Sequence, residues 1–296
     1  MTNERTGLPA SGKLYVVATP IGNLGDLSAR ARDTLAGCSL IAAEDTRHTG
    51  VLLKAFGIGT PQLSLHDHNE ASRAIEIIAR LREGKSIALV SDAGTPAISD
   101  PGFELVRQVA AAGLDIIAVP GPCAAIAALS IAALPTDRFC FEGFLPARSA
   151  ARRQRLKSLA QEVRTLVLYE SPHRVRDTLE DCVAAFGEDR AAAIVREATK
   201  LHETTYRGSL KELLLQSKSD PDLSRGEIVL IVGGMTQAPA CDTDAEMASG
   251  LDKVLRALLA ELPLKQAAHL AAQITGARDN EAYKRALFLK QQSASH

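Results

Sequence analysis

Short apolar segments alternate with helical patterns along the first 134 residues. The apolar segments are 14–18, 40–43, 87–90 and 115–119. Their length suits buried strands, and the segments between them show helical spacing, as with Ile75, Ile78 and Leu81 in a helix expected over 71–82. This alternation predicts a parallel sheet covered by helices, because parallel strands need crossover connections.

Three of the predicted strands end in loops rich in proline and glycine, at 19–26, 91–102 and 120–125. The middle loop is longer than the 2–6 residues or so that usually join strand to helix, although an ordinary connection remains the simpler alternative. Open α/β sheets bind ligands beyond the carboxyl ends of their strands. We therefore expect one pocket to collect all three loops. The first loop lacks the G-x-G-x-x-G pattern, which argues against a dinucleotide site.

Polar clusters follow three other strand ends, at 44–49, 66–70 and 170–174. Helix capping explains part of each cluster, with Asn69 or Asp67 and Ser171 as the expected N-caps. The remaining side chains favour a substrate or catalytic role, with capping plus solvated charge as the alternative. His66 and His68 should face opposite sides of an extended segment, which favours a polar substrate wall over a metal site.

Bulk composition places limits on the class of protein. A length of 296 residues suits about two domains, and no apolar run reaches the roughly 20 residues that a membrane helix needs. The first 12 residues lack the apolar core of a signal peptide and are expected to fray. Five dispersed cysteines argue against disulfides and zinc, and predict a reducing, cytoplasmic location. A net charge of −1 leaves nucleic-acid binding to local patches.

The pattern changes near Pro135. Strands expected at 139–144, 165–168, 191–196, 204–208 and 228–232 indicate a second α/β domain. A basic run follows the first of these strands, and it is either a solvated helix face or a contact to phosphates. It contains no acid, and its members are Arg148, Arg152, Arg153, Arg155 and Lys157. A linker is expected at 233–243, followed by three short helices that resemble a helix-turn-helix module or close a dimer. The predicted domains are 13–136, 137–234 and 246–290.

Taken together, these motifs resemble the ribosomal RNA small subunit methyltransferase I family of the tetrapyrrole-methylase superfamily. The resemblance runs from about Lys13 to Lys290. It is carried by TPIGNL at 19–24, EDTRH at 44–48, HNE at 68–70, SDAGTP at 91–96 with DPG at 100–102, PGP at 120–122 and YESPHR at 169–174.

The resemblance implies a class III methyltransferase fold, with two α/β domains, a cleft between them and a small C-terminal helical module. It further implies a homodimer that uses S-adenosylmethionine to methylate the 2′-hydroxyl of a cytidine ribose in 16S rRNA, near the decoding site. The cofactor-binding residues carried over are Pro20, Gly94, Thr95, Pro96, Ser99, Cys123, Ala124, Glu170 and Ala198. The first loop reads Thr-Pro-Ile-Gly and the second Gly-Thr-Pro, where small-molecule enzymes of the superfamily tend to have Gly-Pro-Gly-Asp and Gly-Asp-Pro. These departures favour the RNA branch.

A ribose hydroxyl holds its proton tightly, so methyl transfer gains from a positioned general base. The candidates are Asp45, His48, His66, Glu70 and Asp92, and the sequence does not choose among them. The side chains expected to contact RNA are Glu44, Arg47, Asn69, Arg148, Arg152, Arg153, His173, Arg174 and Lys200. The alternatives are a methylase of a tetrapyrrole or another small molecule, and an RNA-binding protein without catalysis.

Overall fold

The computed structural model describes residues 12–66, 68–235 and 243–293, with the side chains of 243–250 and 291–293 left out. The predicted N-terminal tail, most of the predicted linker, Asp67 and Cys241 lie outside the described residues. The chain divides into two compact units, residues 1–235 and 236–296. None of the described helices combines the length and the apolar character needed to span a membrane.

The first sheet contains five parallel strands in the order β3-β2-β4-β1-β5. Their bounds are Leu14–Val17 (β1), Leu40–Ala43 (β2), Gln62–Ser64 (β3), Ile87–Val90 (β4) and Ile116–Val119 (β5). The predicted parallel sheet is thereby confirmed. The three loops rich in proline and glycine follow the neighbouring strands β4, β1 and β5, so they leave the same edge of the sheet.

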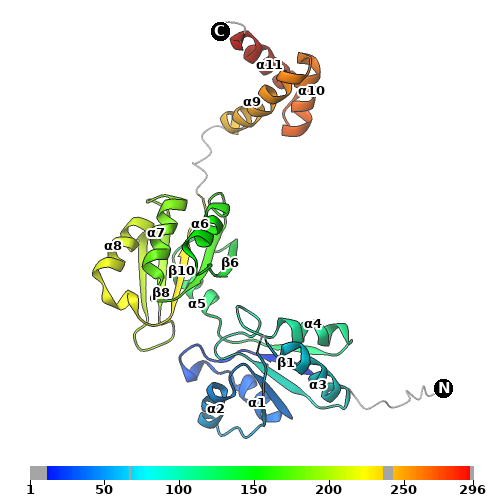
Figure 1. Ribbon diagram of the computed structural model, residues 1–296, viewed down its shortest axis with the longest axis vertical. Helices are drawn as coiled ribbons and strands as arrows, with labels where there is room; N and C mark the ends of the chain where they lie inside the picture. The colour runs from blue at the N-terminus through cyan, green and yellow to red at the C-terminus, as the bar shows by residue number, and fades with distance from the viewer. Residues whose placement is uncertain (1–11, 67, 236–242, 294–296) are drawn as a thin grey trace, which may run out of the picture. The chain divides into compact units, whose positions relative to one another are not determined.

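Helices cover both faces of this sheet. Their bounds are Ala29–Gly37 (α1), Thr46–Ala55 (α2), Glu70–Arg82 (α3) and Phe103–Ala111 (α4), with a short 3₁₀ turn at Leu24–Asp26 (η1). Figure 1 labels these four helices together with strand β1 of the sheet. Ile77 and Leu81 of α3 and Leu105 of α4 pack on one face, while Leu35 of α1 and Leu53 of α2 pack on the other. Ser28 caps α1 by accepting a hydrogen bond from the Ala31 amide.

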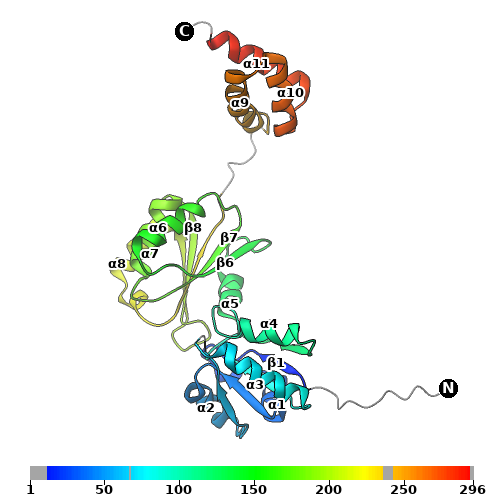
Figure 2. The ribbon, with the colours of Figure 1, turned by 45° about the vertical axis from the view of Figure 1, so that its right-hand side comes forward.

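Helix α5, Ala124–Ile131, follows the third loop but packs on the second sheet. Its Ala128 and Leu129 contact Val167, Val229 and other residues of that sheet. The third loop therefore connects the first sheet directly to the core of the second half of the unit, as Figure 2 shows from the side.

The second sheet is mixed, with the order β6-β7-β10-β8-β9. Its strands are Phe139–Phe144 (β6), Thr165–Glu170 (β7), Ala191–Arg196 (β8), Thr204–Ser209 (β9) and Ile228–Val232 (β10). Only β6 and β7 pair in parallel, and β10 lies between β7 and β8 with antiparallel pairing on both sides. The face opposite α5 is covered by α6 (Ser149–Ser158), α7 (Val175–Phe186) and α8 (Leu210–Ser219).

Two local predictions in this half are wrong. Helix α7 begins at Val175 with Arg174 in the N-cap position, so Ser171 does not cap it and Pro172 lies in the preceding turn. Helix α8 was not expected, although Ser209 and Glu212 form a capping box at its start. A 3₁₀ turn at Pro221–Ser224 (η2) leads from α8 toward β10.

The C-terminal unit consists of α9 (Thr243–Glu261), α10 (Leu264–Thr275) and α11 (Asp279–Ser293). Leu251 and Leu255 pack against small side chains such as Ala268, Ala271 and Ala286, which lets the helices approach closely. Pro263 precedes α10, and Gly276 ends it with φ +73°. Both oxygens of the Asp252 carboxylate accept hydrogen bonds from Arg285, at 2.6 Å each, which ties α9 to α11.

Candidate active site

The three loops rich in proline and glycine are tied to one another. Thr19 and Gly94 exchange two backbone hydrogen bonds, of 2.9 and 3.1 Å, and the Thr95 hydroxyl donates to the Pro122 carbonyl at 3.1 Å. A Cβ atom added at Gly121 would lie 3.0 Å from the Cβ of Ala18, so the absence of a side chain there lets the third loop approach β1. The expectation that the loops gather at one edge is confirmed.

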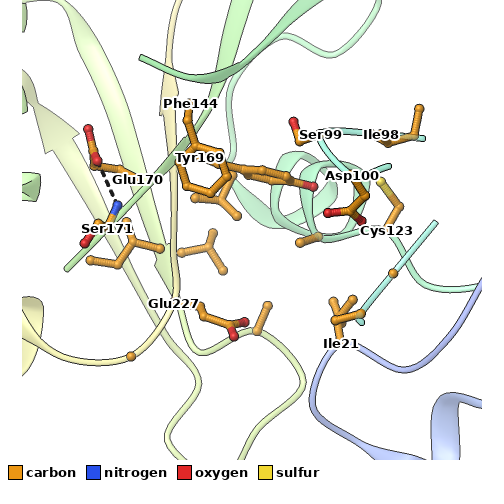
Figure 3. A pocket seen from close by; sticks show the side chains of 18 of the residues that line it. Ile21, Ile98, Ser99, Asp100, Cys123, Phe144, Tyr169, Glu170, Ser171 and Glu227 are labelled. Carbon is orange, nitrogen blue, oxygen red and sulfur yellow. Dashed lines mark hydrogen bonds between the residues drawn. The ribbon is translucent and has the colours of Figure 1, made fainter. Parts of the chain in front are cut away.

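A cavity of about 340 Å³ lies where these loops meet the second sheet (Figure 3). Ile21, Ile98, Phe144, Val195 and Val229 make much of its wall apolar. Its carboxylates are Asp100, Glu170 and Glu227. Asp100 and Glu227 come from opposite halves of the unit, and Figure 3 shows both pointing into the cavity. The site thus combines a flat apolar surface with two negative charges.

Most of the residues predicted to bind a cofactor line this cavity. They are Gly94, Thr95, Ser99, Cys123, Ala124, Glu170 and Ala198. Pro20 and Pro96, both described, are not among the lining residues, and Pro96 is buried. These two prolines shape the loops from behind the wall, since a proline fixes φ without offering an amide donor.

Several residues of the wall are not among those predicted from the sequence to bind a cofactor. Ile21, Ile98, Asp100, Phe144, Tyr169 and Glu227 belong to this group. Tyr169 is a central one, because its hydroxyl accepts a hydrogen bond from the Ala125 amide at 3.2 Å and its ring packs edge-on against Phe141 and Phe144. Burial raises the pKa of Tyr169 to about 12. The available signal was the position of Phe144 and Tyr169 at the ends of two adjacent strands.

A network of acids lies beside the cavity at the ends of β2 and β4. The Asp92 carboxylate accepts a hydrogen bond from the Asp45 amide at 3.0 Å, and the Glu44 carboxylate accepts one from the Asp92 amide at 3.4 Å. Asp45 caps α2 and pairs with Arg47, at 2.6 Å between Oδ2 and Nη2. The Arg47 guanidinium holds the pKa of Asp45 well below its usual range, which makes Asp45 a poor general base. His48 is exposed on α2.

The cluster after β3 is organised around Asn69. Its Oδ1 accepts a hydrogen bond from the His66 amide at 2.9 Å, and its Nδ2 lies 3.2 Å from the Ser64 carbonyl and 3.1 Å from His66 Nε2. Because Nδ2 is a donor, His66 Nε2 must accept, and the proton of the neutral ring is on Nδ1. Nδ1 is buried and has no hydrogen-bond partner among the described residues. His66 therefore presents a donor rather than a base.

Two predictions about this cluster are corrected. His66 and His68 do not face opposite sides: their rings pack edge-on, with centroids 6.0 Å apart, because both follow the end of β3 rather than lying in it. Asn69 occupies the N-cap position of α3, but its side chain makes no capping bond. The buried Glu70 carboxylate accepts a hydrogen bond from the Leu105 amide at 2.8 Å near the start of α4, so it holds two helices together. Among the described residues, no three potential metal ligands gather.

The basic run divides into buried and exposed members. Arg152, only 4% exposed, donates to the buried Asp181 carboxylate at 2.7 Å, and Arg155 pairs with Glu142 at 2.5 Å. Arg152 is therefore unavailable to a phosphate, which corrects its predicted role. Arg148 and Arg153 are exposed. The run lacks acids in sequence, but acids from β6 and α7 neutralise two of its charges.

The cluster at 170–174 is largely occupied by its own contacts. The Glu170 carboxylate accepts hydrogen bonds from the Ser171 amide at 2.7 Å and the Thr178 hydroxyl at 2.5 Å, so it is turned away from the cavity (Figure 3). Arg174 donates to the Leu145 carbonyl at 2.9 Å and pairs with Glu170. The sequence suggests that Glu170 and Arg174 are free to act in the site, but these contacts occupy both side chains. His173 is exposed.

Lys200 joins the two halves of the unit. Its ammonium lies 2.9 Å from Glu197 and 3.3 Å from Glu227, which lines the cavity. Its stem crosses Gly22, where an added Cβ would lie 2.4 Å from the Lys200 Cγ. The side chain therefore contacts the first loop and the cavity wall together, so a direct contact to RNA is not its main role.

Comparisons with known proteins agree with this architecture. The family model of tetrapyrrole (corrin/porphyrin) methylases matches residues 13–214, and the model of the RsmI C-terminal HTH domain matches residues 244–290. The ribosomal RNA small subunit methyltransferase I of Escherichia coli O157:H7 is 53% identical over 97% of this chain and 99% of its own length. The protein of the same name from Pseudomonas aeruginosa is 52% identical over 94% and 98%.

Solved structures support the fold at lower identity. A uroporphyrin-III-C-methyltransferase from Thermus thermophilus has a TM-score of 0.53 and 22% identity, covering 75% of this chain and 94% of that one. A cobalt precorrin-4 methyltransferase has a TM-score of 0.56 and 20% identity, with the same coverage. The chain belongs to the tetrapyrrole methylase family and, within it, to the ribosomal RNA small subunit methyltransferase I family, with S-adenosylmethionine as its methyl donor.

Proposed function

We propose that this chain methylates the 2′-hydroxyl of a cytidine ribose in 16S rRNA of the small ribosomal subunit, near the decoding site. The observation that carries the proposal is the cavity in which the three tied loops meet the second sheet. Beside it, the ends of β2, β3 and β4 carry polar side chains that do not belong to a hydrophobic core. The relatives named ribosomal RNA small subunit methyltransferase I support RNA as the substrate.

The cavity suits S-adenosylmethionine. Its apolar wall, with Ile21, Ile98 and Phe144, offers a surface for the adenine ring, and Asp100 and Glu227 offer negative charge to a ligand that carries a sulfonium and an amine. Backbone groups at Gly94 and Ala124 can approach the ligand closely because the side chains are small. The bound cofactor would supply a methyl group on a cationic sulfur, and the loops would hold it in line with the acceptor.

We assign the acceptor wall to the neighbouring ends of β2, β3 and β4. Backbone pairing brings these strand ends together, since the Leu65 amide donates to the Ala43 carbonyl at 2.8 Å and Ala43 pairs with Val90. Arg47, with 90% of its side chain exposed, can reach a phosphate. The Glu44 and Asp92 carboxylates hold the loops that carry this wall.

Two further surfaces are proposed to contact the RNA. Arg148, Arg153 and His173 are exposed. Cationic side chains of this kind bind RNA by neutralising its phosphates, and the affinity gained in this way falls as the salt concentration rises. The C-terminal module, expected at 246–290, is the second surface, supported by the family model that matches it. The division of the rest of the chain into domains 13–136 and 137–234 remains part of the proposal.

The proposal includes a cytoplasmic homodimer. Helix α5 is almost wholly apolar, yet Ile126 and Ile131 are exposed. A helix that is apolar on all sides is normally buried. A second copy of the chain would cover this face.

The decisive experiment maps ribose methylation on small-subunit RNA from cells with and without the gene, followed by methylation of purified subunits with S-adenosylmethionine. We expect one cytidine to lose its 2′-O-methyl group without the protein and to regain it in vitro. A small-molecule methylase, which the named functions of the solved neighbours favour, would leave the RNA pattern unchanged and turn over without RNA. A non-catalytic RNA-binding protein would bind the subunit and transfer no methyl group.

A further inference from the structure

The reaction restricts where a general base can lie. The accepting oxygen must meet the donor methyl group inside the cavity, and a base must come within hydrogen-bond reach of that oxygen's proton. None of Asp45, His48, His66, Glu70 and Asp92, all of which are described, lines the cavity. Asp45 and Glu70 are also engaged in holding helix ends. The base is therefore best sought among the carboxylates of the wall itself.

Two of the three wall carboxylates are unsuitable. Glu170 accepts hydrogen bonds from Ser171 and Thr178, pairs with Arg174 and is turned away from the cavity (Figure 3). The Glu227 side chain is 73% exposed and lies 3.3 Å from the Lys200 ammonium, so water and a fixed cation stabilise its charge. A carboxylate stabilised in this way is a weaker base.

Asp100 is the remaining carboxylate. It is half-buried, and it points into the cavity between Ser99 and Cys123 (Figure 3). Its carboxyl is hydrogen-bonded to the Ser91 side chain. We propose that Asp100 is the general base that accepts the proton of the ribose 2′-hydroxyl during methyl transfer. This assignment rests on the proposed function.

The loop that carries Asp100 is held in an unfavourable conformation. Ala97 and Ser99 have backbone φ values of +68° and +63°, which residues other than glycine rarely adopt. Strain of this kind persists where surrounding structure enforces it, and it concentrates at functional sites. Here Gly143 of β6 makes room for the loop, because a Cβ added there would lie 2.9 Å from the Ser99 hydroxyl oxygen. The second sheet thus fixes the position of Asp100.

The electrostatic surroundings of Asp100 suit a base. Burial raises the pKa of its carboxyl above the ordinary value, and the nearby charge of Asp92 raises it further, while the Ser91 hydrogen bond acts in the opposite direction. Tyr169, also facing Asp100, stays neutral because its own pKa is raised to about 12. A raised pKa brings a carboxylate closer to the pH at which the enzyme works, which favours proton transfer.

The proposed step balances. The ribose oxygen forms a bond to the methyl carbon as the bond between that carbon and the cofactor sulfur breaks, and the sulfur keeps the electron pair. The Asp100 carboxylate takes the hydroxyl proton as the new bond forms. Asp100 later releases this proton to solvent. The sulfonium has become a neutral thioether, so the released proton carries the positive charge that the donor had at the start.

The test compares Asp100→Asn with wild-type full-length protein, using purified small subunits and saturating S-adenosylmethionine. We expect the single-turnover rate to fall about 10²- to 10⁴-fold even at saturating S-adenosylmethionine, with a much smaller loss of cofactor affinity because one negative charge leaves the cavity. The wild-type rate should fall as the pH drops through the carboxyl pKa, and Asp100→Asn should lose this dependence. Asp100→Ala with added formate should regain part of the rate, which tests the role even if one variant folds poorly.

Glu227→Gln is the matched control. It removes one negative charge from the same cavity and should weaken cofactor binding more than it slows the chemical step. The assignment is overturned if Asp100→Asn keeps the wild-type rate, or if its whole defect is weaker cofactor binding. If wild-type protein itself fails to methylate the subunit, the proposed function fails. The two failures can be told apart, because failure of the assignment alone leaves wild type and Asp100→Asn equally active.

Discussion

Thr19 and Gly94 form an isolated antiparallel bridge between two loops that leave parallel strands. Its two hydrogen bonds, 2.9 and 3.1 Å long, fix the first loop against the second before any ligand is bound. Preorganisation of this kind reduces the ordering that binding would otherwise require. The cavity should therefore respond sharply to small changes in the loops around it.

The contact between Gly22 and Lys200 provides one such test. Gly22→Ala would place a Cβ 2.4 Å from the Lys200 Cγ, so the Lys200 side chain must shift from its place between the first loop and Glu227. We expect S-adenosylmethionine binding, measured by calorimetry, to weaken about tenfold, or about 1.4 kcal/mol. Shortening Lys200 to alanine in the same chain should relieve part of this loss. Independent losses in the double variant would show that the two residues do not couple.

The neighbours Arg152 and Arg153 should behave differently. Removing one partner of a buried ion pair costs about 3–5 kcal/mol, so Arg152→Ala should lower the free energy of unfolding by roughly this amount, measured in urea. Arg153, whose side chain is 57% exposed and lies 3.9 Å from the other Asp181 oxygen, too far for a hydrogen bond, is the matched control. Its alanine variant should keep its stability and should weaken RNA binding with a shallower salt dependence. Equal stability of the two variants would contradict the buried pairing.

Asp100→Asn should stabilise the protein at neutral pH. The folded-state pKa of this carboxyl is raised, so between the unfolded value near 3.8 and the folded value the native state binds more protons than the unfolded state. Stability contributed by the group therefore falls as the pH rises through this window. Urea unfolding should show a variant more stable than wild type at pH 7, with the difference shrinking as the pH falls through the folded pKa of Asp100 and absent below about 3.8. A less stable variant at pH 7 would show that the carboxylate is favourably paired.

A chain ending at Met235 should keep cofactor binding. The core of the C-terminal unit is built from its own residues, such as Leu255, Ala271 and Leu289, and the cores of the first unit contain none of them. We expect the truncated chain to fold and to bind S-adenosylmethionine in calorimetry with wild-type affinity, while its affinity for the small subunit falls. Full methylation of the small subunit by the truncated chain would contradict the proposed RNA contact of the C-terminal module.

The sequence predicts the elements of the first sheet well because strand, loop and helix signals agree there. β2, at Leu40–Ala43, coincides with the predicted strand, and α3, at Glu70–Arg82, begins one residue before the predicted helix. The cavity wall was harder to predict. Gly94 and Cys123 stand out beside prolines, whereas Asp100 and Glu227 gain their positions only when the two halves of the unit meet.

Charged side chains were the weakest part of the prediction, for a physical reason. The sequence places Arg152 in a run without acids, but its partner Asp181 lies on α7, 29 residues away. The carboxylate of Glu170 likewise finds its donors after the chain turns into α7. Whether a charge is free depends on tertiary contacts, and local sequence carries little information about them.

The central position of β10 has a consequence for synthesis. All five strands of the first sheet lie before residue 120, so this sheet can close while the rest of the chain is still being translated. The second sheet cannot, because β7 and β8 are separated by a strand that ends at Val232. The nascent chain must keep β7 and β8 apart until nearly the whole unit has left the exit tunnel. Only then can both walls of the cavity exist.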